Sequence, residues 1–196
     1  MPDEGYIKFR CLHTPGPAPE CAGLDALIRI RNRLHGLGLI GVLPDGIGFG
    51  NISLRTGDGF VISASATGHI ALATAGHFSL VERCDIGSNT VWCRGPLAAS
   101  SESMTHWAVY QAAPLIRSVI HVHDQRMWRG MLDRGDPCTE PEAAFGTPEL
   151  ARSVMSLARG RSSLTLAMPG HEDGVMTGGE TADAALELLL GCLNPG

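Results

Sequence analysis

Two histidines separated by one residue, His121 and His123, have the type and spacing of a metal-binding pair. They lie in RSVIHVH, residues 117–123, whose alternating β-branched residues predict a buried strand. Residues two apart on a strand point to the same face, so both imidazoles would project together while Ile120 and Val122 face the core. Neighbouring imidazoles are common ligands of first-row divalent metals, and the pair therefore favours a metal site over two structural histidines.

The pair alone does not identify an enzyme class, because unrelated metalloenzymes share it. In the metallo-hydrolase pattern HxHxD an aspartate would stand at position 125, whereas this chain has Gln125, with Asp124 one residue earlier. An amidohydrolase barrel would also need more than 196 residues, since barrels of that kind typically take about 250. The metal site must therefore be assigned from further residues.

A third ligand is needed, and His171 is a candidate that comes from a different part of the chain. It lies in the turn PGHEDG, residues 169–174, directly after a segment that is typical of a strand. Such a turn suits a ligand that arrives from a second element, but an ordinary polar turn residue fits the spacing equally well. The spacing leaves both interpretations of His171 open.

A carboxylate at the start of a helix is the candidate acid/base. Ser100 and Ser101 stand where an N-cap belongs, and Glu102 follows in the first turn of a helix that should run to about Ala113. A helix–turn–strand unit returns the chain antiparallel and would bring Glu102 near the histidine pair, where a carboxylate can move a proton. A capping acid is the simpler interpretation of Glu102, and His106, on the same helix face, fits a supporting or a packing role.

Length and composition limit the mechanism. The chain suits one domain over residues 1–196, and its proline-rich start indicates an irregular arm over 1–22. Fourteen of the 15 basic residues are arginines, and Lys8 is the only lysine. A mechanism that needs a buried lysine to form a Schiff base is therefore close to excluded.

Charge and targeting features limit the partners. The net charge is −5 and the arginines form no basic stripe, so we expect no nucleic-acid partner. No apolar run approaches the roughly 20 residues of a membrane span, and we expect no membrane partner. The start MPDEGYIKFR is unlike a secretory signal, and six dispersed cysteines without a CxxC motif suit reduced thiols. These features predict a cytoplasmic protein.

The remaining segments predict the elements that must position these residues. A helix is expected over 24–39 from its apolar periodicity, another from Thr147, which precedes proline and glutamate, and a last one from Thr181. Short strands are expected in hairpin order at NISLR (51–55), GFVIS (59–63), FSLVERC (78–84), NTVWCR (89–94) and later at SLTLAM (163–168). Together they predict an α/β fold with a mostly antiparallel sheet covered by helices.

Five motifs in order resemble the class II aldolase/adducin superfamily. They are GNISLR (50–55), the Thr67–Gly68 turn, SSES (100–103) before a helix, SVIHVH (118–123) and FGTPEL (145–150). The resemblance runs from about residue 24 to 190. It implies an αβα layered fold and a homotetramer with active sites between subunits.

The resemblance also implies roles for individual residues. His121, His123 and His171 correspond to zinc ligands, and Glu102 corresponds to the acid/base. Small polar turns correspond to a phosphate cradle, and they comprise Gly50, Asn51, Thr67, Gly68, Ser100 and Ser101. Backbone N–H groups and hydroxyls bind anions without lysine, which suits this composition.

The implied chemistry is that of a metal-dependent lyase. It would cleave or form a C–C bond in a small hydroxy-carbonyl substrate, such as a sugar phosphate, through an enediolate stabilised by Zn²⁺, with Mn²⁺, Co²⁺ or Fe²⁺ left open. The superfamily also offers epimerisation, dehydration or decarboxylation of a similar substrate. A non-catalytic, adducin-like module is less favoured, because Glu102, His121 and His123 are all present.

The chain departs from the superfamily pattern in two places. The stretch between His123 and Phe145 is shorter than in sugar-phosphate aldolases and carries no tyrosine to act as proton donor. Glu172 and Asp173 follow His171 where a His-Gly pair is expected, so either of them is an alternative third ligand. These departures leave the substrate and the type of reaction open.

Overall fold

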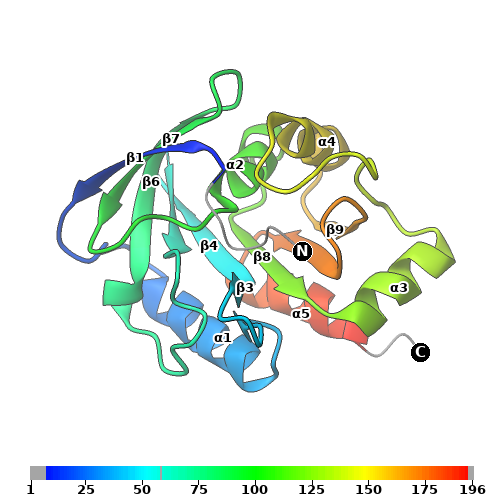
Figure 1. Ribbon diagram of the computed structural model, residues 1–196, viewed down its shortest axis with the longest axis horizontal. Helices are drawn as coiled ribbons and strands as arrows, with labels where there is room; N and C mark the ends of the chain where they lie inside the picture. The colour runs from blue at the N-terminus through cyan, green and yellow to red at the C-terminus, as the bar shows by residue number, and fades with distance from the viewer. Residues whose placement is uncertain (1–7, 58, 194–196) are drawn as a thin grey trace.

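Eight strands form one sheet in the computed structural model, which describes residues 8–57 and 59–193 (Figure 1). Their order is β1-β7-β6-β5-β4-β8-β10-β9, and the β1–β7 pair is parallel whereas the other pairs are antiparallel. A separate ribbon pairs β2 (Gly41–Val42) with β3 (Gly48–Phe49). The strands of the large sheet are β1 (Arg10–Pro15), β4 (Asn51–Thr56), β5 (Gly59–Ser63), β6 (Phe78–Asp85), β7 (Thr90–Gly95), β8 (Ser118–His123), β9 (Leu164–Met168) and β10 (Gly174–Gly179).

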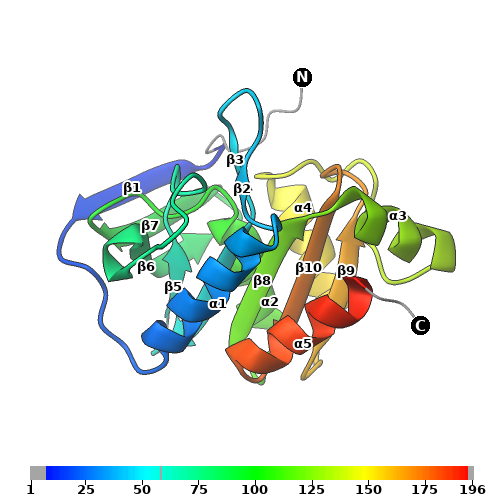
Figure 2. The same ribbon diagram turned by 90° about the horizontal axis from the view of Figure 1, so that it is seen from below.

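Helices cover both faces of this sheet. Figure 2 shows α1 (Leu24–Gly36) and α5 (Ala182–Leu193) in front of the strands, with α2 (Ser103–Ala112) and α4 (Pro148–Ala158) behind them. The helix α3 (Gln125–Arg134) follows β8 at the far end, and a short 3-10 turn, η1 (Ala75–His77), precedes β6. The αβα layering and the mostly antiparallel sheet confirm the predicted fold class.

Strand β8 shows how sequence alternation separates the two layers. Ile120 and Val122 are fully buried in the core that packs under α1 and α5. Val119 instead joins the core under α2 and α4. Because side chains alternate along a strand, His121 and His123 share the face of Val119, as their spacing predicts.

The irregular arm predicted for residues 1–22 is wrong for the part that forms β1. Residues 10–15 pair in parallel with β7, from Arg10 opposite Thr90 to Pro15 opposite Gly95. Proline is tolerated here because β1 is an edge strand and Pro15 is its last residue, so no ladder hydrogen bond is lost. Residues 1–7 lie outside the described part of the chain.

Several element ends differ from the sequence-based expectation. The first helix ends at Gly36 rather than near residue 39. The helix expected from Ser100 begins at Ser103, and Glu102 occupies its N-cap position. The start of α4 is as predicted, because the Thr147 hydroxyl accepts a hydrogen bond from the Leu150 amide at 3.3 Å.

Two further features bear on the sequence-based expectations. The six cysteines are free thiols, although the Cys11 and Cys93 sulfurs on neighbouring strands lie 3.7 Å apart. Among the helices that the structure describes, none combines the length and apolar character needed to cross a membrane.

Candidate active site

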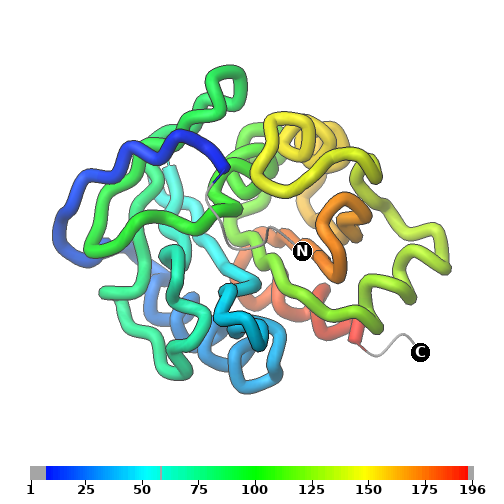
Figure 3. The backbone as a smooth tube through the Cα atoms, viewed as in Figure 1, coloured from blue at the N-terminus to red at the C-terminus, as the bar shows by residue number. Residues whose placement is uncertain are grey.

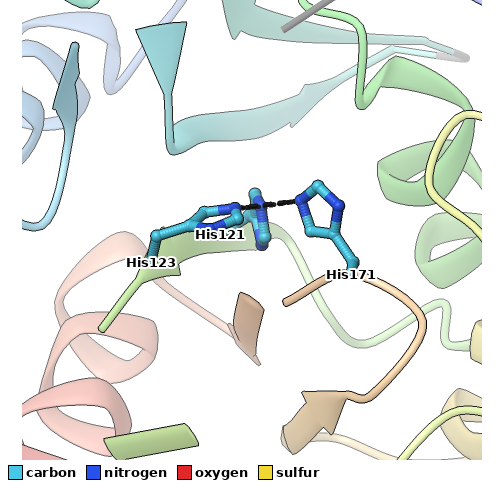
Figure 4. A group of neighbouring side chains, drawn as sticks. All are labelled: His121, His123 and His171. Carbon is cyan, nitrogen blue, oxygen red and sulfur yellow. Dashed lines mark hydrogen bonds between the residues drawn. The ribbon is translucent and has the colours of Figure 1, made fainter. Parts of the chain in front are cut away.

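Three imidazoles converge at one end of β8. The Nε2 atoms of His121 and His123 lie 3.0 Å apart, and the His171 Nε2 lies 3.2 and 2.9 Å from them (Figure 4). Tetrahedral zinc with Zn–N bonds of about 2.0–2.1 Å separates its nitrogens by about 3.3 Å. These three nitrogens therefore have nearly the spacing of metal ligands, and they are the one group of this kind found among the described residues.

The pairing of β8 with β10 brings His171 to the other two histidines. Gly174, the first residue of β10, lies opposite His123, so the turn before β10 sits beside the histidine pair. In Figure 3 this orange turn lies next to the green chain that leaves β8. The His171 amide donates to the Met168 carbonyl at 2.9 Å, and the Gly174 amide donates to the His171 carbonyl at 2.9 Å. The turn is thus held by its own backbone.

Gly174 is required by the closeness of these rings. A Cβ atom at this position would lie 2.7 Å from the His171 Cδ2 and 3.3 Å from the His121 Cε1. Of the three alternatives for the third ligand, His171 is the one in the cluster, whereas the Glu172 side chain is exposed and Asp173 has a φ of 63°. The tight turn therefore directs the imidazole, rather than the two following carboxylates, to the pair.

Burial keeps the imidazoles in the form that binds metal. Burial and the neighbouring His123 hold the pKa of His121 well below its ordinary value, and the same two causes lower the pKa of His171. The His121 Nδ1 lies 3.1 Å from the Val175 carbonyl, so Nδ1 donates its proton there. The Nε2 lone pair of His121 is then directed to the cluster.

Glu102 lies beside the histidines. Its side chain is 3% exposed, and one carboxylate oxygen lies 4.0 Å from the His171 Nε2. The residue stands at the N-cap of α2, where its amide donates to the Ser100 hydroxyl at 3.3 Å. The helix start thus places a buried carboxylate next to the cluster.

A cavity of about 410 Å³ joins these groups to the polar turns. Its lining includes Glu102, His121 and His171, and the partly buried His123 lies next to the lining histidines in the cluster. Six further lining residues are those that the resemblance assigns to a cradle, and we call them the polar cradle: Gly50, Asn51, Thr67, Gly68, Ser100 and Ser101. All ten predicted site residues are thus at one place in the fold.

The polar cradle depends on close backbone packing. A Cβ at Gly68 would lie 2.1 Å from the Gly41 carbonyl oxygen, and Gly50 has a φ of 74°. Asn51 stands opposite His121 in the β4–β8 ladder, which links the cradle to the histidines. Its buried Oδ1 has no hydrogen-bond partner among the described residues, as expected for an atom that contacts a ligand.

Three residues near the site were not identified from the sequence. Phe145 lines the cavity with its ring centroid 5.0 Å from that of His171, and the Lys8 ammonium lies 3.9 Å from the Phe145 centroid. Arg31 also lines the cavity and is 1% exposed. The signal for Arg31 was its place on the apolar stripe of α1, four residues after Leu27, where a surface arginine would not stand.

His106 and Tyr110 lie outside the cavity lining. The His106 Nδ1 is 2.6 Å from the Ser53 hydroxyl, and the Tyr110 hydroxyl is 2.7 Å from the same oxygen. The His106 side chain therefore joins α2 to β4, and the contact of His106 with Glu102 is the backbone hydrogen bond from the His106 amide to the Glu102 carbonyl at 3.1 Å. Tyr110 is 3% exposed and bound to this network, so it does not supply a proton donor to the cavity, and Tyr6 lies outside the described residues.

Comparison with curated proteins gives one related enzyme. The chain is 28% identical over 156 residues to a 5-methylthioribulose-1-phosphate/5-deoxyribulose-1-phosphate aldolase of Rhodospirillum rubrum. The match covers 72% of this chain and 66% of that relative's length.

Solved structures share the fold. An L-fuculose-1-phosphate aldolase from Thermus thermophilus superposes with a TM-score of 0.58 and 24% identity, covering 84% of this chain and 83% of that one. The YgbL protein of Escherichia coli gives a TM-score of 0.61 and 16% identity, with 85% and 82% covered. The sequence also matches the family described as Class II Aldolase and Adducin N-terminal domain over residues 43–192. This match spans most of the chain and includes all ten site residues, and the chain therefore belongs to the class II aldolase and adducin N-terminal domain family.

Proposed function

We propose that the protein is a metal-dependent aldolase-type lyase that acts on a small phosphorylated hydroxy-carbonyl compound. The observation that carries this proposal is the convergence of three imidazole Nε2 atoms with a buried carboxylate 4.0 Å away. The same cavity is lined elsewhere by small polar turns, so the metal site and the anion site that we propose would share one space. A non-catalytic module would not need this combination.

The three histidines suit a divalent cation. His121, His123 and His171 would hold it through neutral imidazoles, and three protein ligands leave a position open for substrate, as in catalytic zinc sites. Zinc is the cation that we propose, and Mn²⁺, Co²⁺ and Fe²⁺ accept similar donors. When bound, the cation would act as a Lewis acid that stabilises negative charge on the substrate's oxygens.

Glu102 is placed to move the proton. Its carboxylate is buried beside the histidines, and a nearby cation would favour the ionised form that accepts a proton. In the cleavage direction it would accept the hydroxyl proton while the C–C bond breaks, and in the reverse direction it would return that proton. Such positioned proton transfer is worth about 10²–10⁴-fold in rate.

The polar cradle is placed to hold the anionic end of the substrate. Hydroxyls of Thr67, Ser100 and Ser101 and the amide of Asn51 are buried within the cavity lining. The N-terminus of α2 begins directly after these serines and favours negative charge. The cradle would therefore fix the phosphate while the hydroxy-carbonyl end lies at the histidines.

The relative's name suggests the first substrates to assay. It gives ribulose 1-phosphates with a 5-deoxy or 5-methylthio end. Cleavage of 5-deoxyribulose 1-phosphate between C3 and C4 yields dihydroxyacetone phosphate and acetaldehyde.

The test is product analysis with the metal-loaded protein. We expect NMR to show dihydroxyacetone phosphate and an aldehyde in equal amounts, and to show the ketose formed from the same two compounds in reverse. A product with the carbon skeleton intact would contradict the proposal and indicate epimerisation or dehydration. A purified protein that holds no metal and gives no turnover would also contradict it.

We also propose a homotetramer, as the family resemblance implies. Light scattering should then give four times the 20.7 kDa of one chain. A monomer with full activity would exclude a site that needs a neighbouring subunit.

A further inference from the structure

Arg31 is a buried cation whose donors are directed to backbone oxygens. One guanidinium nitrogen donates to the Thr67 carbonyl at 2.8 Å, and the other donates to the Ile70 carbonyl and lies 3.5 Å from that of Ala71. The side chain rises from α1 and holds the loop that follows β5. The guanidinium therefore lies directly behind the Thr67–Gly68 turn of the polar cradle.

The charge of Arg31 is not matched by a carboxylate. Buried charges are ordinarily paired, because taking an ion out of water is costly. Within the described ranges, 8–57 and 59–193, no ion pair joins Arg31 to an acidic side chain, and its acceptors are carbonyls and the Asn32 amide oxygen. Since Arg31 also lines the cavity, its uncompensated charge favours an anion there.

The hydrogen bond to Thr67 also orients the turn. In a trans peptide the N–H points opposite to the C=O. Because the Thr67 carbonyl points to the guanidinium, the following Gly68 N–H points away from it, and Gly68 lines the cavity. Arg31 thus both charges the turn and fixes which way its amide points.

We propose that Arg31 is a positioning residue that makes the polar cradle select a dianionic phosphate group. This inference rests on the proposed function in taking the substrate to be phosphorylated. It does not depend on which reaction the protein catalyses. It explains how a chain with one lysine, placed outside the cavity lining, can bind an anion. The positive charge acts through the turn, so the phosphate contacts hydroxyls and amides while Arg31 stays behind them.

The first experiment measures binding of inorganic phosphate by calorimetry, without turnover. Arg31→Gln should weaken phosphate binding about tenfold or more, while Arg31→Lys, which keeps the charge, should retain more of the affinity. Arg55→Gln is the matched control, because Arg55 also donates to backbone carbonyls, those of Tyr110 and Ile116, but does not line the cavity. It should lower the melting temperature without changing phosphate affinity.

A second control separates charge from loop anchoring. Asn32, the next residue on α1, holds the same loop through two hydrogen bonds with the Ala73 backbone, at 2.9 and 3.2 Å. Asn32→Ala should loosen the loop yet keep most of the phosphate affinity. Equal losses in Asn32→Ala and Arg31→Gln would overturn the proposal, because anchoring alone would then explain them.

Kinetics and NMR give independent readouts. With a phosphorylated substrate, Arg31→Gln should raise KM more than it lowers kcat, whereas a merely structural role would lower kcat in parallel with stability. If Arg31→Gln fails to fold, titration of the wild-type protein with phosphate should shift the arginine side-chain signal of Arg31 and leave that of Arg55 in place. An unshifted Arg31 signal would overturn the proposal.

These experiments distinguish a failure of the inference about the Arg31 charge from a failure of the proposed C–C cleavage reaction. Phosphate binding that depends on Arg31, with no C–C cleavage, would support the inference and defeat the proposed reaction. Cleavage of an unphosphorylated substrate by a protein that does not bind phosphate would support the C–C cleavage reaction and overturn the inference about Arg31.

Discussion

The histidine cluster and the polar cradle line one cavity but are built in different ways. The cluster consists of side chains, with His121 and His123 carried by a central strand and Glu102 by a helix start. The cradle relies on close backbone packing, since Gly68 admits no Cβ against the Gly41 carbonyl. The difference teaches that the cluster presents directed lone pairs, which suit a cation, whereas the cradle presents hydroxyl and amide donors close to the backbone, which suit an anion.

The two parts also differ in charge. At the cluster, burial lowers the pKa of His121 and His171, so these imidazoles are neutral and suited to receive a cation. Behind the cradle stands Arg31, a cation suited to attract an anion. Substitutions that affect one part and spare the other are therefore the sharpest tests.

The largest effect is expected from His121→Ala. Losing one of three ligands should abolish stable metal binding, a greater loss than the 10–100-fold typical of an outer hydrogen-bond partner, and activity should be lost with it. Elemental analysis and chelator competition measure the metal, and phosphate calorimetry should show the cradle intact. His35→Ala on α1 is the control and should keep full metal content. A His121→Ala protein with normal metal affinity would contradict the assignment.

Glu102→Gln should lower turnover without weakening the binding of metal at the cluster or of phosphate at the cradle. The amide keeps the shape but cannot accept a proton, so we expect normal metal content and a kcat lowered about 10²–10⁴-fold. Glu149→Gln is the matched control, because Glu149, like Glu102, stands at the start of a helix but is exposed. Retained turnover in Glu102→Gln would leave Glu102 as a capping residue only.

The sequence predicted the cluster better than the rest of the site because its signal is local. Alternation in RSVIHVH places both imidazoles on one face, and the strand β8 forms as expected. The turn that carries His171 is placed by the pairing of β10 with β8. The sequence of β10, GVMTGG, has three glycines and little alternation. That strand was missed because its burial, and not its own pattern, makes it extended.

Residues that act over long sequence distances were also missed. Arg31 was missed although it stands on the apolar stripe of α1, because arginines also occupy the neighbouring positions and the loop after β5 that it binds is distant in sequence. The strand β1 was missed because the prolines at its end and just after it outweighed its pairing with β7, a partner about 80 residues away. The helix α3 differs, because its start is marked locally by Asp124, whose carboxylate accepts a hydrogen bond from the Met127 amide at 2.7 Å.

Two glycine substitutions should affect opposite parts of the cavity. In Gly174→Ala the new Cβ would lie 2.7 Å from the His171 ring, so the imidazole must move and metal affinity should fall about 10–100-fold. In Gly68→Ala the clash is with the Gly41 carbonyl, so phosphate affinity should fall while metal binding stays. Metal and phosphate titrations on both variants check that each substitution weakens the binding of one ligand and not of the other.

The control for both is Gly191→Ala on α5, where a Cβ meets no atom within 4 Å. It should be neutral or stabilising by up to about 1 kcal/mol, because alanine favours the helix. If Gly174→Ala and Gly68→Ala instead weakened both ligands equally, the two parts would be one cooperative unit and the comparison would fail.

The smallest effect on the cavity is expected from His106 on α2, whose side chain is hydrogen-bonded to Ser53 on β4. This bond connects the helix that follows Glu102 with the strand that carries Asn51. Burial lowers the pKa of His106 to about 3, so the unfolded chain binds its proton more readily than the folded protein does. The free energy of unfolding should therefore fall as the pH drops from about 6.5 towards 3, by up to about 1.4 kcal/mol per pH unit from this group. His106→Gln removes the titration, so its stability should depend less on pH in this window, as measured by urea unfolding. An unchanged slope would contradict this prediction, because it would show that His106 takes up its proton in the folded protein as it does in the unfolded chain.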